Sequence, residues 1–130
     1  MLLLDTNVLI QIKDVRLPSE DVVLSALTYA ELRFGVEGAI DARARRRRVA
    51  DLARVNAMFP TPWLSFDQNA AESYARLAAR VATRRASHAR STDIMLAGHA
   101  NALGAKLVTF NAKDFELVAD EVEIVVPERR

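Results

Sequence analysis

The sequence predicts an α/β fold, an α/β/α sandwich in which helices flank a five-stranded parallel sheet. Short apolar runs recur along the 130 residues, and longer stretches whose apolar residues have helical spacing lie between them. Strands and helices that alternate in this way build a parallel sheet with right-handed crossovers. No repeat, low-complexity tract or linker interrupts the pattern, so we expect one domain over residues 1–130.

The short apolar runs predict strands over residues 2–4, 22–24, 63–66, 106–110 and 123–126. Helices are predicted between them, over residues 7–13, 28–38, 42–59, 68–87 and 92–103. Helical spacing is clearest in the third and fourth of these, where it is carried by Val49, Leu52, Val55 and Phe59 and by Tyr74, Leu77, Ala78 and Val81. Helix ends are predicted at Pro60, Pro62 and Gly104.

The composition excludes several classes of protein. The chain has no cysteine, which rules out a disulfide framework, a zinc finger and thiol chemistry. No apolar run approaches the roughly 18 residues of a membrane span, and the opening run reaches Asp5 too early for a signal peptide. We therefore expect a soluble cytoplasmic protein with no membrane partner.

The charge is strongly segregated along the chain. A formal net charge of +1 argues against a nucleic-acid partner when it is taken as a whole. However, 11 of the 15 arginines lie between Arg43 and Arg90, where three acidic residues give a local charge of +8 and leave −7 for the flanks. We expect the basic stretch to bind a negatively charged partner and the acidic flanks to supply the catalytic residues.

Four acidic residues stand where a ligand site is expected. Asp5 and Asp114 follow the first and fourth predicted strands, and the carboxyl ends of parallel strands form the usual ligand edge. Glu31 and Asp93 share helix faces with apolar residues, so we expect both to turn inward. Each also has a purely structural interpretation: Asp5 as a helix N-cap, Glu31 in a capping box with Thr28, Asp93 as a first-turn acid and Asp114 as a turn former.

Together, four inward carboxylates require neutralisation. Hard cations such as Mg²⁺ or Mn²⁺ prefer oxygen ligands, and a cluster of this kind supports metal-assisted hydrolysis of phosphodiesters. Hydroxyl and amide side chains beside the acids are suited to orienting the carboxylates, and these are Thr6, Asn7, Thr109 and Asn111.

Four segments resemble those of PIN-domain ribonucleases, and most closely the VapC toxins of bacterial VapBC toxin–antitoxin pairs. They are LLLDTNVLI at the start, Ser25-x-x-Thr28-x-x-Glu31-Leu-x-x-Gly35, the run from Asp93 to Ala100, and Leu107-Val-Thr109-x-Asn111-x-x-Asp114-Phe115. The resemblance implies an RNA endonuclease that depends on Mg²⁺ or Mn²⁺. It also implies a five-stranded parallel sheet, a homodimer, and a cognate VapB-like antitoxin that forms a heterotetramer or larger assembly with it.

The same resemblance implies that Asp5, Glu31, Asp93 and Asp114 are catalytic and bind the metal, with Thr109 and Asn111 supporting them. Two positions depart from the family pattern. Phe110 stands where many relatives have a polar or basic residue, and Gly98 where alanine is frequent. Neither departure removes a metal ligand.

Four arginines are predicted to bind RNA phosphates: Arg76, Arg80, Arg84 and Arg90. The first three lie on one helix face, and Arg90 lies three residues before Asp93. Local ion pairs such as that of Arg76 with Glu72, or an acidic stretch of the antitoxin, are the alternatives. We do not expect His88 or His99 to act as a catalytic base.

Two other functions are compatible with the length and alternation of elements. One is a PIN fold that binds a partner without catalysis. The other is a phosphoacceptor receiver or a small aspartyl phosphohydrolase, which the residues disfavour because Asp5 is followed by Thr6 and Asn7 and only Asp67 fits a phosphoacceptor position.

Overall fold

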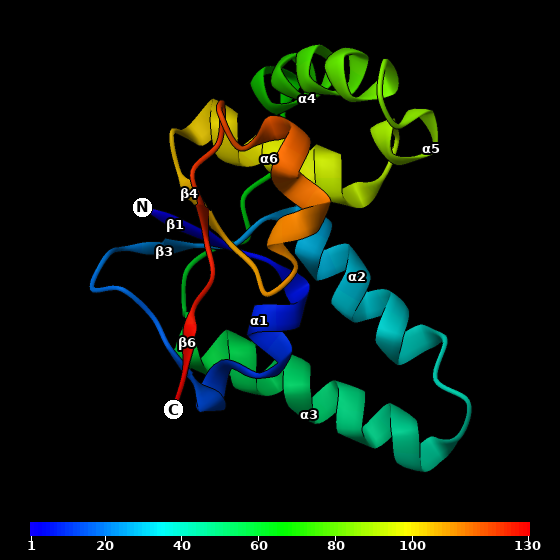
Figure 1. Ribbon diagram of the computed structural model, residues 1–130. Helices are drawn as coiled ribbons and strands as arrows, with labels where there is room; N and C mark the ends of the chain where they lie inside the picture. Colours follow the sequence, from blue (N-terminus) through cyan, green and yellow to red (C-terminus); the bar gives the residue numbers. More distant parts are fainter.

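A four-stranded parallel sheet lies at the centre of the computed structural model, which describes residues 1–130 (Figure 1). Its strands are β1 (Leu2–Leu4), β3 (Val22–Val23), β4 (Lys106–Val108) and β5 (Ile124–Val125), in the order β3-β1-β4-β5. The buried leucines of β1 pair with both neighbours, with Leu3 opposite Val23 on one side and Leu107 on the other. This arrangement confirms the α/β class.

The predicted strand over residues 63–66 is wrong as a strand. Only Leu64 pairs, in a single parallel bridge to Ser25 beyond the end of β3. Its N–H donates to the Leu24 carbonyl over 2.7 Å, and its carbonyl accepts from the Ala26 N–H over 2.8 Å. Pro62 has no N–H to donate, and Asp67 already caps the next helix, so too few residues remain for a ladder.

Six α-helices surround the sheet: α1 (Thr6–Ile10), α2 (Ala26–Glu37), α3 (Ala42–Met58), α4 (Gln68–Ala82), α5 (Ala86–Ala89) and α6 (Thr92–Leu103). Their starts are set by local capping, because the side chains of Asp41, Asp67 and Ser91 accept hydrogen bonds from the first turns of α3, α4 and α6. The helix predicted over residues 68–87 is shorter than expected, since the chain breaks after Ala82 and α5 is separate.

Four short elements were not predicted. Two are 3₁₀ helices, η1 (Ile12–Asp14) and η2 (Ala112–Val118). The other two are strands β2 (Val15–Arg16) and β6 (Glu128–Arg129), which pair antiparallel outside the main sheet. The 3₁₀ helix η2 matters for function because it carries Asp114.

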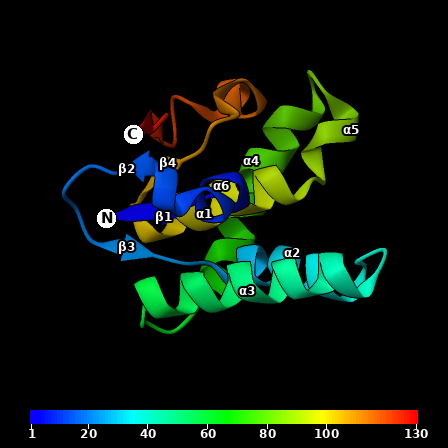
Figure 2. The same ribbon diagram turned by 90° about the horizontal axis from the view of Figure 1, so that it is seen from below.

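Two buried apolar clusters hold the helices against opposite faces of the sheet, as in a three-layer sandwich (Figure 2). Side chains alternate along β1, so Leu3 joins the cluster with α4, α6 and η2, whereas Leu2 and Leu4 join the cluster with α1, α2 and α3. The helix hairpin of α2 and α3 projects from the second face in both views.

The contact between α4 and α6 is unusually close at Gly98. A Cβ atom at this position would lie 2.6 Å from the Tyr74 Cα and 2.7 Å from the Tyr74 N. The two helix backbones can approach this closely only because residue 98 has no side chain.

The structure contains no helix that is long and apolar enough to cross a membrane.

Candidate functional site

Asp5 lies at the carboxyl end of β1, where the chain turns directly into α1. It is 6% exposed. One carboxylate oxygen accepts the Thr6 backbone N–H over 2.8 Å, so Asp5 is also the N-cap of α1. The structural and the functional interpretations of Asp5 are therefore compatible, because capping uses one oxygen and leaves the second facing the end of β4.

Thr109, at the end of β4, holds that second oxygen. Its hydroxyl donates to Asp5 Oδ2 over 2.8 Å and accepts the Asn111 backbone N–H over 3.0 Å. The Asn7 amide contacts both Asp5 Oδ2 and Thr109 Oγ1 at 3.4 Å, and its oxygen accepts the Phe110 N–H over 3.3 Å. These contacts orient the carboxylate as predicted for Thr109 and Asn7. Asn111 contributes its backbone N–H, and the residue is exposed.

Glu31 reaches the same site from α2. Its Oε1 accepts the Thr6 hydroxyl over 3.1 Å. The capping-box interpretation is wrong, because the N-cap of α2 is Ser25. Glu31 does reach the edge of the sheet as expected, because its carboxylate contacts Thr6 just after the end of β1, but the residue is exposed and not buried. It stands at one side of an open groove of about 350 Å³, which is lined by Thr6, Leu27, Ala30, Glu31, Phe34 and Thr92.

Asp93 and Asp114 complete the group from α6 and η2. Asp93 lies in the first turn of α6, and Asp114 lies in η2, six residues after Val108 at the end of β4. Neither residue is fully exposed. The chain thus brings four carboxylates, separated by up to 109 positions in the sequence, to one edge of the sheet.

The four carboxylates interact electrostatically. Burial raises the pKa of Asp5, and the negative charge of Asp114 raises it further against the hydrogen bonds from Thr109 and Thr6. The pKa of Glu31 is raised by desolvation and then by the charges of Asp5 and Asp93. Desolvation also raises the pKa of Asp93, and the charges of Asp5 and Asp114 add to this effect. Asp5, Asp93 and Asp114 therefore each make the ionisation of at least one neighbouring acid more costly.

The donor set fits a hard divalent cation. All the candidate ligands are oxygens, and a cation would relieve the mutual repulsion of the carboxylates. No three acidic or histidine side chains converge on one point in the structure. Mg²⁺ usually takes one or two protein carboxylates and completes its shell with water and substrate phosphate.

The family follows from comparison with known proteins. Residues 2–121 match the family model of the PIN domain. This chain belongs to the PIN domain family. The receiver and phosphohydrolase alternatives are set aside by this finding, and Asp67, the one residue that suited them, accepts the Ala70 N–H as the N-cap of α4.

Named relatives are similar to this PIN domain over nearly their whole length. Ribonuclease VapC1 of Haemophilus influenzae (strain R2866) is 28% identical over 130 residues, which cover 91% of this chain and 92% of the relative. The structure of FitAcB from Neisseria gonorrhoeae is 27% identical, with a TM-score of 0.73 and 97% of both chains covered. A VapBC-5 structure from Mycobacterium tuberculosis, a member of the VapBC family of toxin–antitoxin systems, is 28% identical, with a TM-score of 0.66 and 95% of both chains covered.

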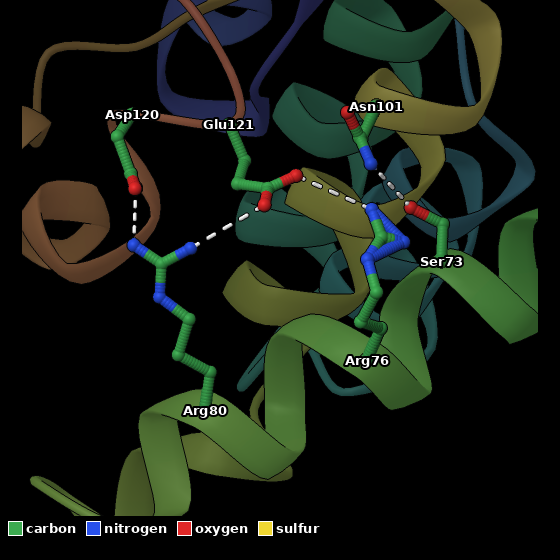
Figure 3. A network of polar contacts seen from close by, with 6 residues as sticks. All are labelled: Ser73, Arg76, Arg80, Asn101, Asp120 and Glu121. Atoms are coloured by element: carbon green, nitrogen blue, oxygen red, sulfur yellow. Dashed lines mark hydrogen bonds and ion pairs between the residues drawn. The ribbon is translucent and has the colours of Figure 1, made fainter.

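Two of the four arginines predicted to bind RNA are held by acids of this PIN domain (Figure 3). Arg76 on α4 donates to Glu121 over 3.3 Å. Arg80 donates to Asp120 and lies 3.5 Å from Glu121. In the same network, the Asn101 amide on α6 meets the Ser73 hydroxyl at 2.9 Å. The count of charges between Arg43 and Arg90 did not include these partners, which lie 40 and 45 positions away from the arginines in sequence.

The other two predicted arginines remain exposed. Arg84 lines a groove with Arg80 and Asp120. Arg90 ends α5 and contacts none of the four acids, although it is the predicted arginine nearest to Asp93 in sequence. Binding of RNA by these two residues stays a prediction.

Two residues around α5, His88 and Arg85, contact Asp114, and Arg85 was not among the predicted site residues. Buried His88 lies with Nε2 2.7 Å from the Asp114 carbonyl oxygen, so the ring donates to it and anchors η2 to α5. Arg85 precedes α5, and its Nη1 lies 4.0 Å from Asp114 Oδ1. Neither contact could be predicted from the sequence, because one continuous helix was expected over residues 68–87, where the structure has a break between α4 and α5.

Proposed function

We propose that this PIN domain is a metal-dependent RNA endonuclease and the toxin of a toxin–antitoxin pair. The observation that carries the proposal is the buried carboxylate of Asp5, which two elements orient and which interacts electrostatically with three further carboxylates. The ribonuclease name of the Haemophilus relative and the toxin–antitoxin membership of the Mycobacterium neighbour support it.

The four acids would hold Mg²⁺ or Mn²⁺ at the carboxyl end of β1. When bound there, the cation supplies Lewis acidity for attack of water on a phosphodiester. Asp5 contributes the most strictly oriented oxygen, because Thr109 and the Thr6 N–H fix both of its oxygens. Glu31 stands at the open side, where a substrate would enter. Neither histidine is suited to the role of base, since His88 is bonded to a carbonyl and buried His99 to the Ser25 hydroxyl.

Purified protein, freed of any partner, is expected to cleave structured RNA with Mg²⁺ and not with a chelator. An Asp5→Asn variant should cleave roughly a thousandfold more slowly, because losing several kcal/mol of cation-dependent stabilisation costs about tenfold per 1.4 kcal/mol. The measurement is the rate of product formation on denaturing gels. Cleavage that is independent of magnesium, or full activity of the variant, would refute the proposal.

The alternative is a PIN fold that binds a partner without catalysis. It predicts that growth arrest by the protein persists when all four acids are neutralised. Our proposal predicts that growth resumes.

We further propose that a cognate antitoxin covers the groove beside Glu31. Large apolar side chains exposed beside a functional site commonly mark a protein interface. Phe34 on α2 is 76% exposed and lines this groove together with Leu27 and Ala30. We expect this chain to form a homodimer. With a VapB-like antitoxin as partner, we expect it to form a heterotetramer or a larger assembly.

Phe34→Ser should weaken antitoxin binding at least tenfold, because it removes a large apolar contact worth about 1.5 to 3 kcal/mol. The matched control is Ile40→Ser in the α2–α3 connection, since Ile40 is 93% exposed and does not line the groove. Titration calorimetry with the product of the adjacent reading frame provides the measurement. Equal losses for both variants would show that the groove is not the interface.

A further inference from the structure

Arg85 is placed beside the acidic cluster by its backbone. Its N–H donates to the Val81 carbonyl over 2.7 Å, and its carbonyl accepts the His88 N–H over 3.0 Å. His88 is itself bonded to the Asp114 carbonyl. The start of α5 is therefore tied both to the end of α4 and to η2, and the Arg85 side chain extends towards Asp114.

The Arg85 guanidinium is available for a ligand. Its separation of 4.0 Å from Asp114 Oδ1 is too long for a hydrogen bond, and none of its five N–H donors has a partner in the protein. The side chain is 50% exposed, and exposed ion pairs of this kind contribute about 0 to 1 kcal/mol. By contrast, Arg76 donates a hydrogen bond to Glu121, and Arg80 donates one to Asp120.

We propose that Arg85 binds a phosphate of the RNA at the acidic cluster, which makes it a substrate-binding residue of the proposed nuclease. A planar guanidinium with free donors recognises phosphate through two parallel hydrogen bonds. Four carboxylates at this edge of the sheet repel a polyanion. Arg85 offsets part of this repulsion, because it forms an ion pair with Asp114, one of the four acids.

Arg85→Gln should lower the single-turnover rate of RNA cleavage by about 10- to 100-fold at saturating protein. Removing one donor aimed at developing charge costs up to about 10²- to 10³-fold in other enzymes. Arg85→Lys should recover part of the loss, since it keeps the charge and loses the paired donors. Arg16→Gln is the matched control, because Arg16 is also exposed and holds one loose ion pair, at 3.8 Å to Glu128 on β6. It should retain the wild-type rate within twofold.

RNA binding in chelator gives a second measurement that does not depend on cleavage. With a fluorescently labelled single-stranded RNA, the slope of log affinity against log salt should become shallower by about 0.7 for Arg85→Gln, which corresponds to one lost phosphate contact. The slope for Arg16→Gln should equal that of the wild type. Equal slopes and equal cleavage rates for the two variants would overturn the proposal.

An Asp114→Asn background separates phosphate binding from a positioning role. If Arg85 merely held Asp114, Arg85→Gln would change nothing further in this background. We expect Arg85→Gln to make the slope of log affinity against log salt shallower by the same amount in the wild-type and Asp114→Asn backgrounds. If the wild type itself fails to cleave RNA with magnesium, the nuclease proposal fails, whereas the salt slope still reports whether Arg85 contacts phosphate.

Discussion

Asp93→Asn should reduce RNA cleavage by roughly a thousandfold and, in chelator at neutral pH, raise the melting temperature of the protein. The loss of cleavage follows from removing a proposed cation ligand, at about tenfold per 1.4 kcal/mol. The gain in stability has a separate cause. Burial and the charges of Asp5 and Asp114 raise the pKa of Asp93, and its side chain makes no hydrogen bond that asparagine would lose. Functional sites often carry a stability cost of this kind.

The sign of the pH dependence follows from linkage. A raised pKa means that folded Asp93 binds its proton more tightly than unfolded Asp93, whose ordinary pKa is 3.8. The stability of the wild type therefore falls as the pH rises through the folded-state pKa of Asp93, and the full cost is present at pH 7. The difference between wild type and Asp93→Asn should disappear as the pH drops towards 3.8.

Thermal unfolding with and without Mg²⁺ measures this effect. Magnesium should raise the melting temperature of the wild type more than that of Asp93→Asn. Asp14→Asn is a suitable control, because Asp14 is exposed and its side chain makes no ion pair. Two results would contradict the assignment of Asp93 to a cation site with mutually repelling carboxylates. One is a lower melting temperature of Asp93→Asn than of the wild type in chelator, and the other is an equal rise in melting temperature with magnesium for both proteins.

Gly98→Ala is expected to destabilise the fold by about 2 kcal/mol. The added methyl group would meet backbone atoms of Tyr74 at 2.6 and 2.7 Å, so α4 must move as a unit. Overpacking costs up to about 3 kcal/mol, and the better helix propensity of alanine returns about 1 kcal/mol. For a chain of this size, the melting temperature should fall by roughly 8 °C.

Gly35→Ala in α2 is the matched control. Its Cβ would lie 3.7 Å from the Arg48 side chain, which is an ordinary contact, so helix propensity alone should decide the outcome. Its melting temperature should equal or exceed that of the wild type. If Gly98→Ala melts within 2 °C of the wild type, the close approach of α4 and α6 is not a constraint on the fold.

Much of the architecture could be predicted from neighbouring residues. The strand at residues 2–4 and the helix starting at residue 92 agree with β1 and α6, since apolar periodicity and capping depend on positions a few residues apart. The position of Asp5 at the end of β1 also followed, because parallel strands share one ligand edge, whereas Asp114 lies in η2, a few residues beyond β4. The predicted strand at 63–66 failed, since pairing depends on how many residues reach the neighbouring strand.

The sequence by itself determined the α/β class, the PIN resemblance and the four acids, all of which rest on short-range patterns. Only the tertiary structure decided which charges meet. Arg80 pairs with Asp120 across 40 positions, and Arg85 reaches Asp114 because the chain breaks before α5. A charge count along the chain cannot show such pairs, because electrostatic energy depends on distances in space, which the packing of α4, α5 and η2 sets.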